Sequence, residues 1–270
     1  SIPSTWAAEP STAVEDNWHQ WRGPTATGVA VRGNPPLRWS ETQNVAWKTE
    51  LPGRGTSSPI VWGDQVFVLA AVKTDRRSDV AEIPRPDKQQ PDEVGGRPVR
   101  LPEAPTHYYR FLVISIHKQT GKVLWQTTVT ERVPHRGHHR DSGYACGSPT
   151  TDGRFLYASF GSYGTHCLDL QGNLRWSRDL GRMETYIDFG EAVTPVIYQG
   201  TLIVVHDHLG QSFIEALDAQ TGKTRWRAER REMAGWATPL IVEHGSLTQV
   251  VVNGAWRTLS YDLETGQIIW

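Results

Sequence analysis

The sequence is poor in cysteine, in long apolar runs and in unbalanced charge. It has only two cysteines among 270 residues, so a fold held together by several disulfides is excluded. No run of 18 apolar residues occurs, and no segment is therefore long enough to cross a bilayer as a helix. The net charge is −1, which provides no overall field to attract nucleic acid or an anionic membrane.

Several chemical motifs are also missing. The sequence has no adjacent cysteine pair, no Ser-His-Asp motif, no phosphate-binding glycine loop and no heptad repeat. Cys146 and Cys167 are expected on two strands that are not neighbours, about 10 Å apart, whereas a disulfide requires Cα atoms within about 7 Å. We expect two free, buried thiols; a disulfide formed through loop curvature is the alternative.

Tryptophan, glycine and proline are abundant, at 12, 25 and 17 residues, which favours many short strands joined by turns. One phrase recurs four times and always ends in tryptophan: "SIHKQTGKVLW" (115–125), "LDLQGNLRW" (168–176), "ALDAQTGKTRW" (216–226) and "SYDLETGQIIW" (260–270). A Ser-Pro or Thr-Pro step precedes each copy, and the successive prolines Pro59, Pro149, Pro195 and Pro239 are 90, 46 and 44 residues apart. A period of about 45 residues with four short strands is typical of a β-propeller blade.

Each repeated residue type has a physical role in such a blade. Proline cannot donate to a strand ladder, but it is tolerated as the first residue of a strand. Glycine permits positive φ in tight hairpins, and tryptophan on the outer strand can fill the gap to the next blade. The sequence predicts an all-β fold, a β-propeller of four-stranded antiparallel blades. The expected hairpin glycines and inter-blade tryptophans are Gly63, Gly153, Gly200, Gly245, Trp125, Trp176, Trp226 and Trp270.

The combination of proline, glycine hairpin, "ALDAQTGKTRW" and "YDLETGQIIW" resembles the pyrroloquinoline-quinone-type β-propeller repeat family. This superfamily includes quinoprotein dehydrogenases, the lipoprotein scaffold of the outer-membrane β-barrel assembly machine and uncharacterised secreted propellers. The resemblance covers about residues 44–270, and "WHQWRGPTATG" (18–28) is similar to uncharacterised bacterial members. It implies a ring of seven or eight blades and, together with the polar residues 1–17, export to the periplasm or the outside of a bacterial cell.

The pattern divides the chain into an N-terminal leader, 1–43, and a propeller, 44–270. The predicted blades span about residues 57–130, 147–180, 192–230 and 236–270, and the first contains an insertion, 73–108. Residues 44–51, with Trp47, form an orphan outer strand that can close a ring, so we expect the chain to be about half of a larger ring completed by missing C-terminal blades. A closed four-blade ring and a homodimer of two half-rings are the alternatives. The insertion is expected to be an extended flap over one face of the propeller; a partly disordered segment without a role is the alternative.

The loops of the predicted blades differ between the two faces. Turns that join the first to the second strand and the third to the fourth are tight, whereas the other loops are long and polar, and a rigid scaffold that gathers long loops on one face usually carries the function there. We expect this face to bind a protein or a polar small molecule. Its candidate residues are His135, His138, His139, Arg140, Asp141, Tyr163, His166, Arg182, Glu184, Tyr186, Asp188, His206, His208, Trp236, Asn253, Trp256 and Arg257.

Two kinds of bound group are weaker candidates on this face. His138, His139 and Asp141 could bind zinc or another transition metal, with His206 and His208 nearby if the loops converge. In the quinone interpretation, Trp236 would stack on pyrroloquinoline quinone, and a calcium ion would be held by Glu184, Asp188 and Asn253. The adjacent cysteines that the resemblance implies for such enzymes are absent.

The sequence favours a non-catalytic binding or scaffolding propeller that binds a partner with its long-loop face, without a cofactor. The alternative is an oxidoreductase of alcohols or sugars that uses pyrroloquinoline quinone and calcium. A metal-dependent enzyme at the histidine loops is a third class.

Overall fold

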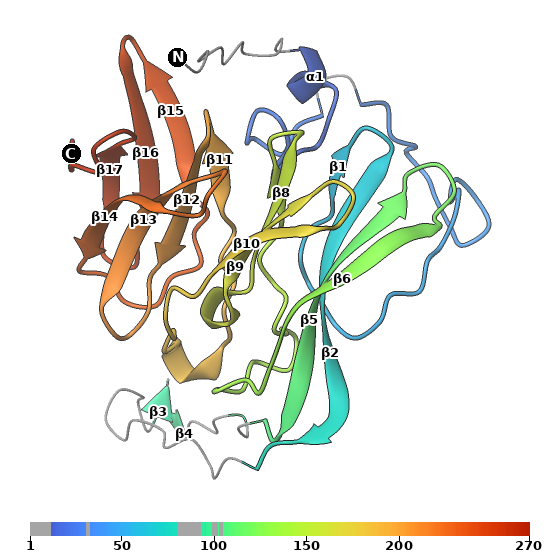
Figure 1. Cartoon of the computed structure of the whole chain (residues 1–270), viewed down its shortest axis with the longest axis horizontal. Coiled ribbons are helices and arrows are strands. Elements are labelled where there is room, and N and C mark those ends of the chain that lie inside the picture. Colours follow the sequence, from blue (N-terminus) through green and yellow to red (C-terminus); the bar gives the residue numbers. More distant parts are fainter. Residues whose placement is uncertain (1–11, 31–32, 80–92, 95, 99–101, 103–104) are drawn as a thin grey trace.

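The structure, a computed structural model, describes residues 12–30, 33–79, 93–94, 96–98, 102 and 105–270. Apart from one two-stranded sheet, the strands of the described residues form four antiparallel sheets that stand side by side in an arc (Figure 1). Within each sheet the strands follow one another in chain order, so each sheet is a meander. This is the all-β propeller architecture that the repeat predicts, and the sheets are called blades one to four below.

The strand bounds show the repeat directly. Blade one contains β1 (Ile60–Trp62), β2 (Gln65–Arg77), β5 (His107–His117) and β6 (Val123–Arg132). Blade two contains β7 (Thr150–Thr151), β8 (Phe155–Ser159), β9 (Thr165–Asp169) and β10 (Leu174–Arg178), and blade three contains β11 (Val196–Tyr198), β12 (Thr201–His206), β13 (Ser212–Asp218) and β14 (Thr224–Arg230). Blade four contains β15 (Leu240–His244), β16 (Leu247–Asn253) and β17 (Thr258–Asp262), and Tyr261 of β17 forms one further bridge with Ile268.

The remaining elements are short. They are α1 (Thr12–Glu15), the two-stranded sheet of β3 (Glu93–Val94) and β4 (Arg97–Pro98), and the 3-10 turns η1 (Gly161–Tyr163) and η2 (Tyr186–Asp188). The long strands β2 and β5 pair as far as Arg77 and His107, so both ends of the predicted insertion 73–108 belong to blade one. Residues 80–92, 95, 99–101 and 103–104 of the predicted flap lie outside the described residues.

The tight hairpins follow from their glycines. Gly63, Gly153, Gly200 and Gly245 have φ values of +57°, +86°, +74° and +61°, a region that costs glycine little because it has no Cβ. These hairpins all lie at the same end of the blades, and the long loops lie at the opposite end (Figure 1).

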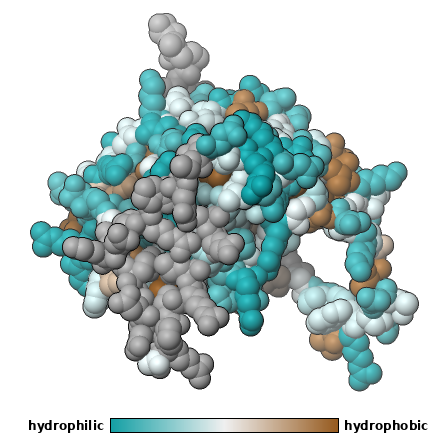
Figure 2. Space-filling model, turned by 90° about the horizontal axis from the view of Figure 1, so that it is seen from below, coloured by the Kyte–Doolittle hydropathy of each residue, from teal (hydrophilic) through white to brown (hydrophobic). Residues whose placement is uncertain are grey.

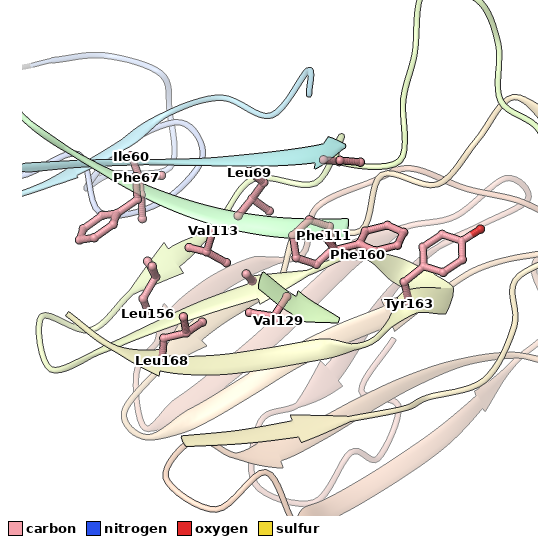
Figure 3. Close-up of a cluster of buried hydrophobic side chains, with 13 residues drawn as sticks. Ile60, Phe67, Leu69, Phe111, Val113, Val129, Leu156, Phe160, Tyr163 and Leu168 are labelled. Atoms are coloured by element: carbon pink, nitrogen blue, oxygen red, sulfur yellow. The ribbon is translucent and has the colours of Figure 1, made fainter. Parts of the chain in front are cut away.

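The core consists of the apolar layers between neighbouring blades. Between blades one and two, Phe67, Phe111 and Val113 face Leu156 and Leu168, and all five are completely buried (Figure 3). Similar clusters separate blade two from blade three and blade three from blade four. Because an inner blade is covered on both sides, its central strands are buried along their whole length, as in β12.

A repeated contact of tryptophan joins the blades at their outer strands. The indole N–H of Trp125 donates to the carbonyl of Leu170 at 3.0 Å, that of Trp176 to Ala219 at 2.9 Å and that of Trp226 to Leu263 at 2.8 Å. In each case the ring lies on the glycine of the next blade's turn, where a Cβ would come within 2.8 Å of it. The predicted inter-blade role of these three tryptophans is confirmed. We call this arrangement the tryptophan seat.

The two ends of the arc use the seat differently. Trp47 occupies the seat of blade one, where its N–H donates to the carbonyl of Lys118 at 2.8 Å and its ring lies on Gly121. Trp270 instead donates to Gln249 of its own blade at 3.1 Å and is 56% exposed. Segment 44–51 joins no sheet among the described residues, and no hydrogen bond there links it to 258–270.

Residues 17–19 contact the inner edges of the first two blades. Trp18 bridges to Val61 of β1, and the carbonyl of His19 accepts a hydrogen bond from the amide of Thr151 at 3.0 Å. Both cysteines are free, as expected from the strand spacing. Burial raises the pKa of Cys167 to about 12.

Candidate functional site

The long loops occupy one end of the blades because antiparallel strands alternate in direction, so every second connection returns to the same side. These are the connections after β6, β10 and β14, together with those between β8 and β9, β12 and β13, and β16 and β17. We call this side the long-loop face. Figure 2 is seen from this side, and the part of the surface that is not grey is mainly hydrophilic with separate hydrophobic spots.

A buried cation lies beneath this face. Arg136, in the loop after β6, has a side chain that is only 7% exposed, and its guanidinium donates to the carboxylate of Glu184. The same guanidinium lies 3.8 Å from a carboxylate oxygen of the fully buried Asp188. Two consecutive loops that each join one blade to the next, 133–148 and 181–194, are therefore joined by ion pairs, in which a planar guanidinium suits two carboxylates.

A third carboxylate lies close to this cluster. Glu191 accepts hydrogen bonds from the amide and the hydroxyl of Ser162, both at 2.6 Å. Burial raises the pKa of Glu191 to about 7, against the opposing effect of the bonds from Ser162. The space enclosed by Arg136, Tyr144, Glu191 and their neighbours has a volume of only about 10 Å³, enough for one water molecule at most.

The histidines where the second and third strands of blades two and three are joined are buried. His206, at the end of β12, stacks on Phe213 with ring centroids 4.8 Å apart, and burial lowers its pKa to about 3. His166 hydrogen-bonds Ser177 at 2.8 Å, and burial lowers its pKa to about 4. His208 accepts hydrogen bonds from the amides of Glu184 and Gly210, at 3.2 and 3.1 Å. These neutral rings support the loops from inside.

Two further ion pairs lie at the loops of blades three and four. Arg230 is completely buried and donates to both carboxylate oxygens of Asp207, at 2.7 and 2.9 Å. Buried Glu232 accepts from the guanidinium of Arg257 at 3.1 Å and from the amide of Trp256 at 2.8 Å. The carboxylates of these loops thus form ion pairs and hydrogen bonds with other residues of the chain.

Aromatic rings remain at the surface where three loops meet. Phe189 and Trp236 are 40% and 42% exposed, and their ring centroids are 6.3 Å apart. Tyr186 and His139 flank Phe189 at 6.3 and 5.7 Å. The N–H of Trp236 donates to the carbonyl of Gly190 at 2.8 Å, which fixes the indole against the neighbouring loop. We call His139, Tyr186, Phe189 and Trp236 the aromatic patch.

The residues predicted for the long-loop face divide by exposure. Exposed or half-buried at the surface are His138, His139, Arg140, Asp141, Arg182, Glu184, Tyr186, Trp236, Asn253, Trp256 and Arg257. Six others do not reach the surface as the loop pattern predicts, because they pack beneath the loops: His135, Tyr163, His166, Asp188, His206 and His208.

Sequence reasoning missed several residues that organise the face. Arg136 stands inside the histidine-rich "PHRGHHRD", where the histidines drew attention to metal chemistry. Phe189 was also missed, although a large apolar residue within the polar loop "METYIDFGEA" is a detectable signal. Glu191, Glu232 and Arg230 gave no signal, because a charged residue in a loop or at the end of a strand is usually solvated.

The donor sets do not suit the metal and quinone interpretations. Among the described residues no group of three His, Cys, Asp or Glu side chains is placed to hold an ion. His138 packs edge-on against Tyr144 at 4.6 Å, and Asn253 accepts a hydrogen bond from Thr258. Glu184 and Asp188, the proposed calcium ligands, already face the guanidinium of Arg136.

Comparison with known proteins identifies a family model that matches residues 110–270, described as "Outer membrane protein assembly factor BamB". No curated protein matches the chain. Among solved structures, BamB from Moraxella catarrhalis is 16% identical, with a TM-score of 0.46, and the match covers 83% of this chain and 50% of that one.

Two quinohemoprotein alcohol dehydrogenases are also similar in structure. The enzyme from Comamonas testosteroni is 14% identical with a TM-score of 0.54, and ADHIIG from Pseudomonas putida HK5 is 12% identical with a TM-score of 0.52. These matches cover 96% and 97% of this chain but 41% of each enzyme. At such identities the likeness shows the fold alone, and the chain spans half or less of the length of these proteins. None of the helices in the described part of the chain has the length and apolar character that a membrane crossing requires.

Proposed function

The chain belongs to the family of the outer membrane protein assembly factor BamB, whose model matches residues 110–270, and from this premise we propose that it is a non-catalytic scaffolding propeller that binds a protein partner with its long-loop face. The main supporting observation is which side chains of the loops are buried and which are exposed. Their carboxylates and most of their histidines hold the loops together from inside, while aromatic and arginine side chains remain outside. Such a surface is suited to binding, because aromatic residues and arginine are enriched at the centres of protein interfaces.

The alternative, a quinone-dependent oxidoreductase, is supported by the fold likeness to the alcohol dehydrogenases but by no group of residues. A calcium ion placed between Glu184 and Asp188 would meet the guanidinium of Arg136, and two cations at one pair of carboxylates repel each other. We therefore favour the scaffold over the enzyme.

The proposed location and assembly also follow from the family. The name of the family model refers to outer membrane protein assembly, so we propose an exported protein that acts in the periplasm as part of such an assembly. We further propose that blades one to four belong to a larger ring. Trp270 presents an indole without a neighbouring turn, while Trp47 already occupies the seat of blade one, which is the arrangement expected if further blades stand between them.

Site-specific photo-crosslinking in cells tests the proposed function. A crosslinking amino acid at the position of Arg182, which is exposed on the long-loop face, is compared with the same amino acid at Asp64, in the tight β1–β2 hairpin on the opposite face. The scaffold predicts a discrete adduct with one protein from position 182 and none from position 64. Equal labelling from both positions contradicts a specific long-loop face. Reduction of an artificial dye by purified protein reconstituted with pyrroloquinoline quinone and calcium would favour the enzyme instead.

A further inference from the structure

The aromatic patch is an apolar surface that the loops hold in one fixed arrangement. Its four rings come from three different loops, those after β6, β10 and β14, and Phe189 contacts the other three rings at centroid distances between 5.7 and 6.3 Å. In a soluble protein, apolar rings gathered at the surface usually mark a binding site.

The loop that carries the centre of the patch is strained. Ile187 and Asp188 have φ values of +43° and +51°, a conformation that is rare for residues with a Cβ and rarest for β-branched ones. Two hydrogen bonds link this loop to the loops on either side. The amide of His139 donates to the carbonyl of Phe189 at 3.4 Å, and the indole N–H of Trp236 donates to the carbonyl of Gly190. Strain of this kind persists where the surroundings hold it, and it concentrates at functional sites. Here it places Tyr186 and Phe189 beside each other at the surface.

The charges around the patch have one predominant sign. Among the acids of the surrounding loops, Glu184, Asp188, Asp207 and Glu232 are paired with arginines, and Glu191 is bonded to Ser162. The two strongly exposed acids in the described parts of these loops are Asp141 and Asp179, at 72% and 60% of their side chains, and they lie 3.6 and 3.7 Å from Arg140 and Arg132. The exposed cations are Arg140, Arg182, Arg231 and Arg257, and in the described part of the chain Arg182 and Arg231 have no ion-pair partner. The surface around the rings is therefore positive although the whole chain has a net charge of −1.

We propose that the aromatic patch binds an extended, acidic polypeptide segment that carries aromatic side chains, a proposal that rests on the scaffolding function and names the chemistry of its partner. Aromatic side chains of the segment pack against Phe189 and Trp236, with edge-to-face geometry available at both rings. Carboxylates of the segment pair with Arg182 and Arg231, which offer the bidentate geometry that carboxylates prefer.

Two other occupants fit the surface less well. A carbohydrate presents hydroxyl donors that need acceptors, whereas the exposed charged groups here are mainly arginines and the acids are turned inward. A nucleic acid strand is attracted by a continuous positive track, and neither the net charge nor the exposed Asp141 provides one. The polypeptide is therefore the occupant that the geometry and the charge favour together.

Fluorescence anisotropy with short labelled peptides tests the proposal on the full chain. In the probe, aspartate alternates with tyrosine; in one comparison peptide lysine replaces aspartate, and in another serine replaces tyrosine. The acidic aromatic peptide is expected to bind at least about tenfold more tightly than either comparison peptide, and its affinity is expected to fall as salt is added because exposed charges are screened. An oligonucleotide or an oligosaccharide that binds as tightly as the probe overturns the proposal.

The variants locate the binding site. Phe189→Ala removes the central ring, and Arg182→Glu together with Arg231→Glu reverses the charge; each is expected to weaken the probe about tenfold. The matched controls are Trp39→Ala, which removes a 72% exposed ring, and Arg38→Glu. Both lie in the N-terminal segment, outside the three loops that form the aromatic patch, and should leave the affinity unchanged. Circular dichroism confirms that each variant is folded.

The outcomes separate this proposal from the scaffolding function. Unchanged probe affinity in folded Phe189→Ala protein overturns the patch as the binding site, as does an equal loss in Trp39→Ala. If crosslinking from position 182 yields a protein adduct but the acidic aromatic peptide does not bind, the scaffold stands and the proposed partner chemistry is wrong.

Discussion

At the scale of single residues, the long-loop face depends on groups that are charged in the sequence but paired or neutral in the fold. Arg136 binds Glu184 and lies beside Asp188, so its charge is satisfied internally. Breaking such a pair by removing one partner leaves an uncompensated buried charge, which costs about 3–5 kcal/mol. The exposed surface therefore has a different charge from the loop sequences that form it.

The buried histidines predict how stability depends on pH. Burial keeps His206 neutral in the folded chain, with a pKa of about 3, whereas the unfolded chain takes up a proton below about pH 6.5. Folding stability is therefore lost as the pH falls from about 6.5 towards 3, by about 1.4 kcal/mol per pH unit for this one group. His206→Phe retains a ring to stack on Phe213 and removes the titration, so we expect it to lose less stability on acidification.

Urea unfolding at about pH 7 and about pH 5 measures this difference. His244→Phe serves as the control, since His244 is exposed at the end of β15. Equal pH dependence of the wild type and His206→Phe would show that His206 is not held neutral. Burial raises the pKa of Glu191 to about 7, so Glu191 adds folding stability as the pH falls from about 7 to 4.5. All three proteins contain Glu191, so its effect cancels in the comparison.

At the scale of elements, the tryptophan seat joins each blade to the next and predicts unequal effects for chemically identical changes. Trp226 lies on the Gly266 turn and donates to Leu263, whereas Trp270 contacts only its own blade and is 56% exposed. Trp226→Ala should lower the free energy of unfolding by about 3 kcal/mol. Trp270→Ala should lower it by less than about 1 kcal/mol. Equal losses in denaturant unfolding would contradict the inter-blade role of the seat.

The repeat made the blades predictable, but the detailed site was not. Glycine turns, strand-opening prolines and the final tryptophans are local signals, so strand order and the position of the long loops followed from spacing alone. The partners of Arg136, Arg230 and Glu232 are in other loops, and no local pattern encodes them. The same reasoning placed His206 and His208 at the surface, because a polar residue in a loop is usually exposed, whereas inter-loop packing buries both.

At the scale of the whole molecule, the two outer sides of the arc differ. Segment 44–51 covers the outward side of blade one, where Trp47 packs against a cluster that includes Val68, Leu112 and Ile114. The outward side of blade four has no comparable cover in the described part of the chain, and Ile268, Ile269 and Trp270 are 57%, 38% and 56% exposed. Within the described residues, blade four therefore packs against a neighbouring sheet on one side only.

This asymmetry predicts the order in which the blades open. Repeated units are stabilised mainly by their neighbours, and local opening has the lowest free energy where buried contacts are fewest. In β16, Val250 and Val252 are fully buried while Val251 between them is not, whereas β12 is buried throughout. Native-state hydrogen exchange should therefore show faster exchange in β16 and β17 than in β12 and β13. Equal protection in the two pairs would mean that a second sheet covers blade four in solution. The variant Trp270→Asp tests whether such a sheet is present. If it is, the aspartate places a charge between the two sheets, and the amides of β16 exchange faster than in the wild type.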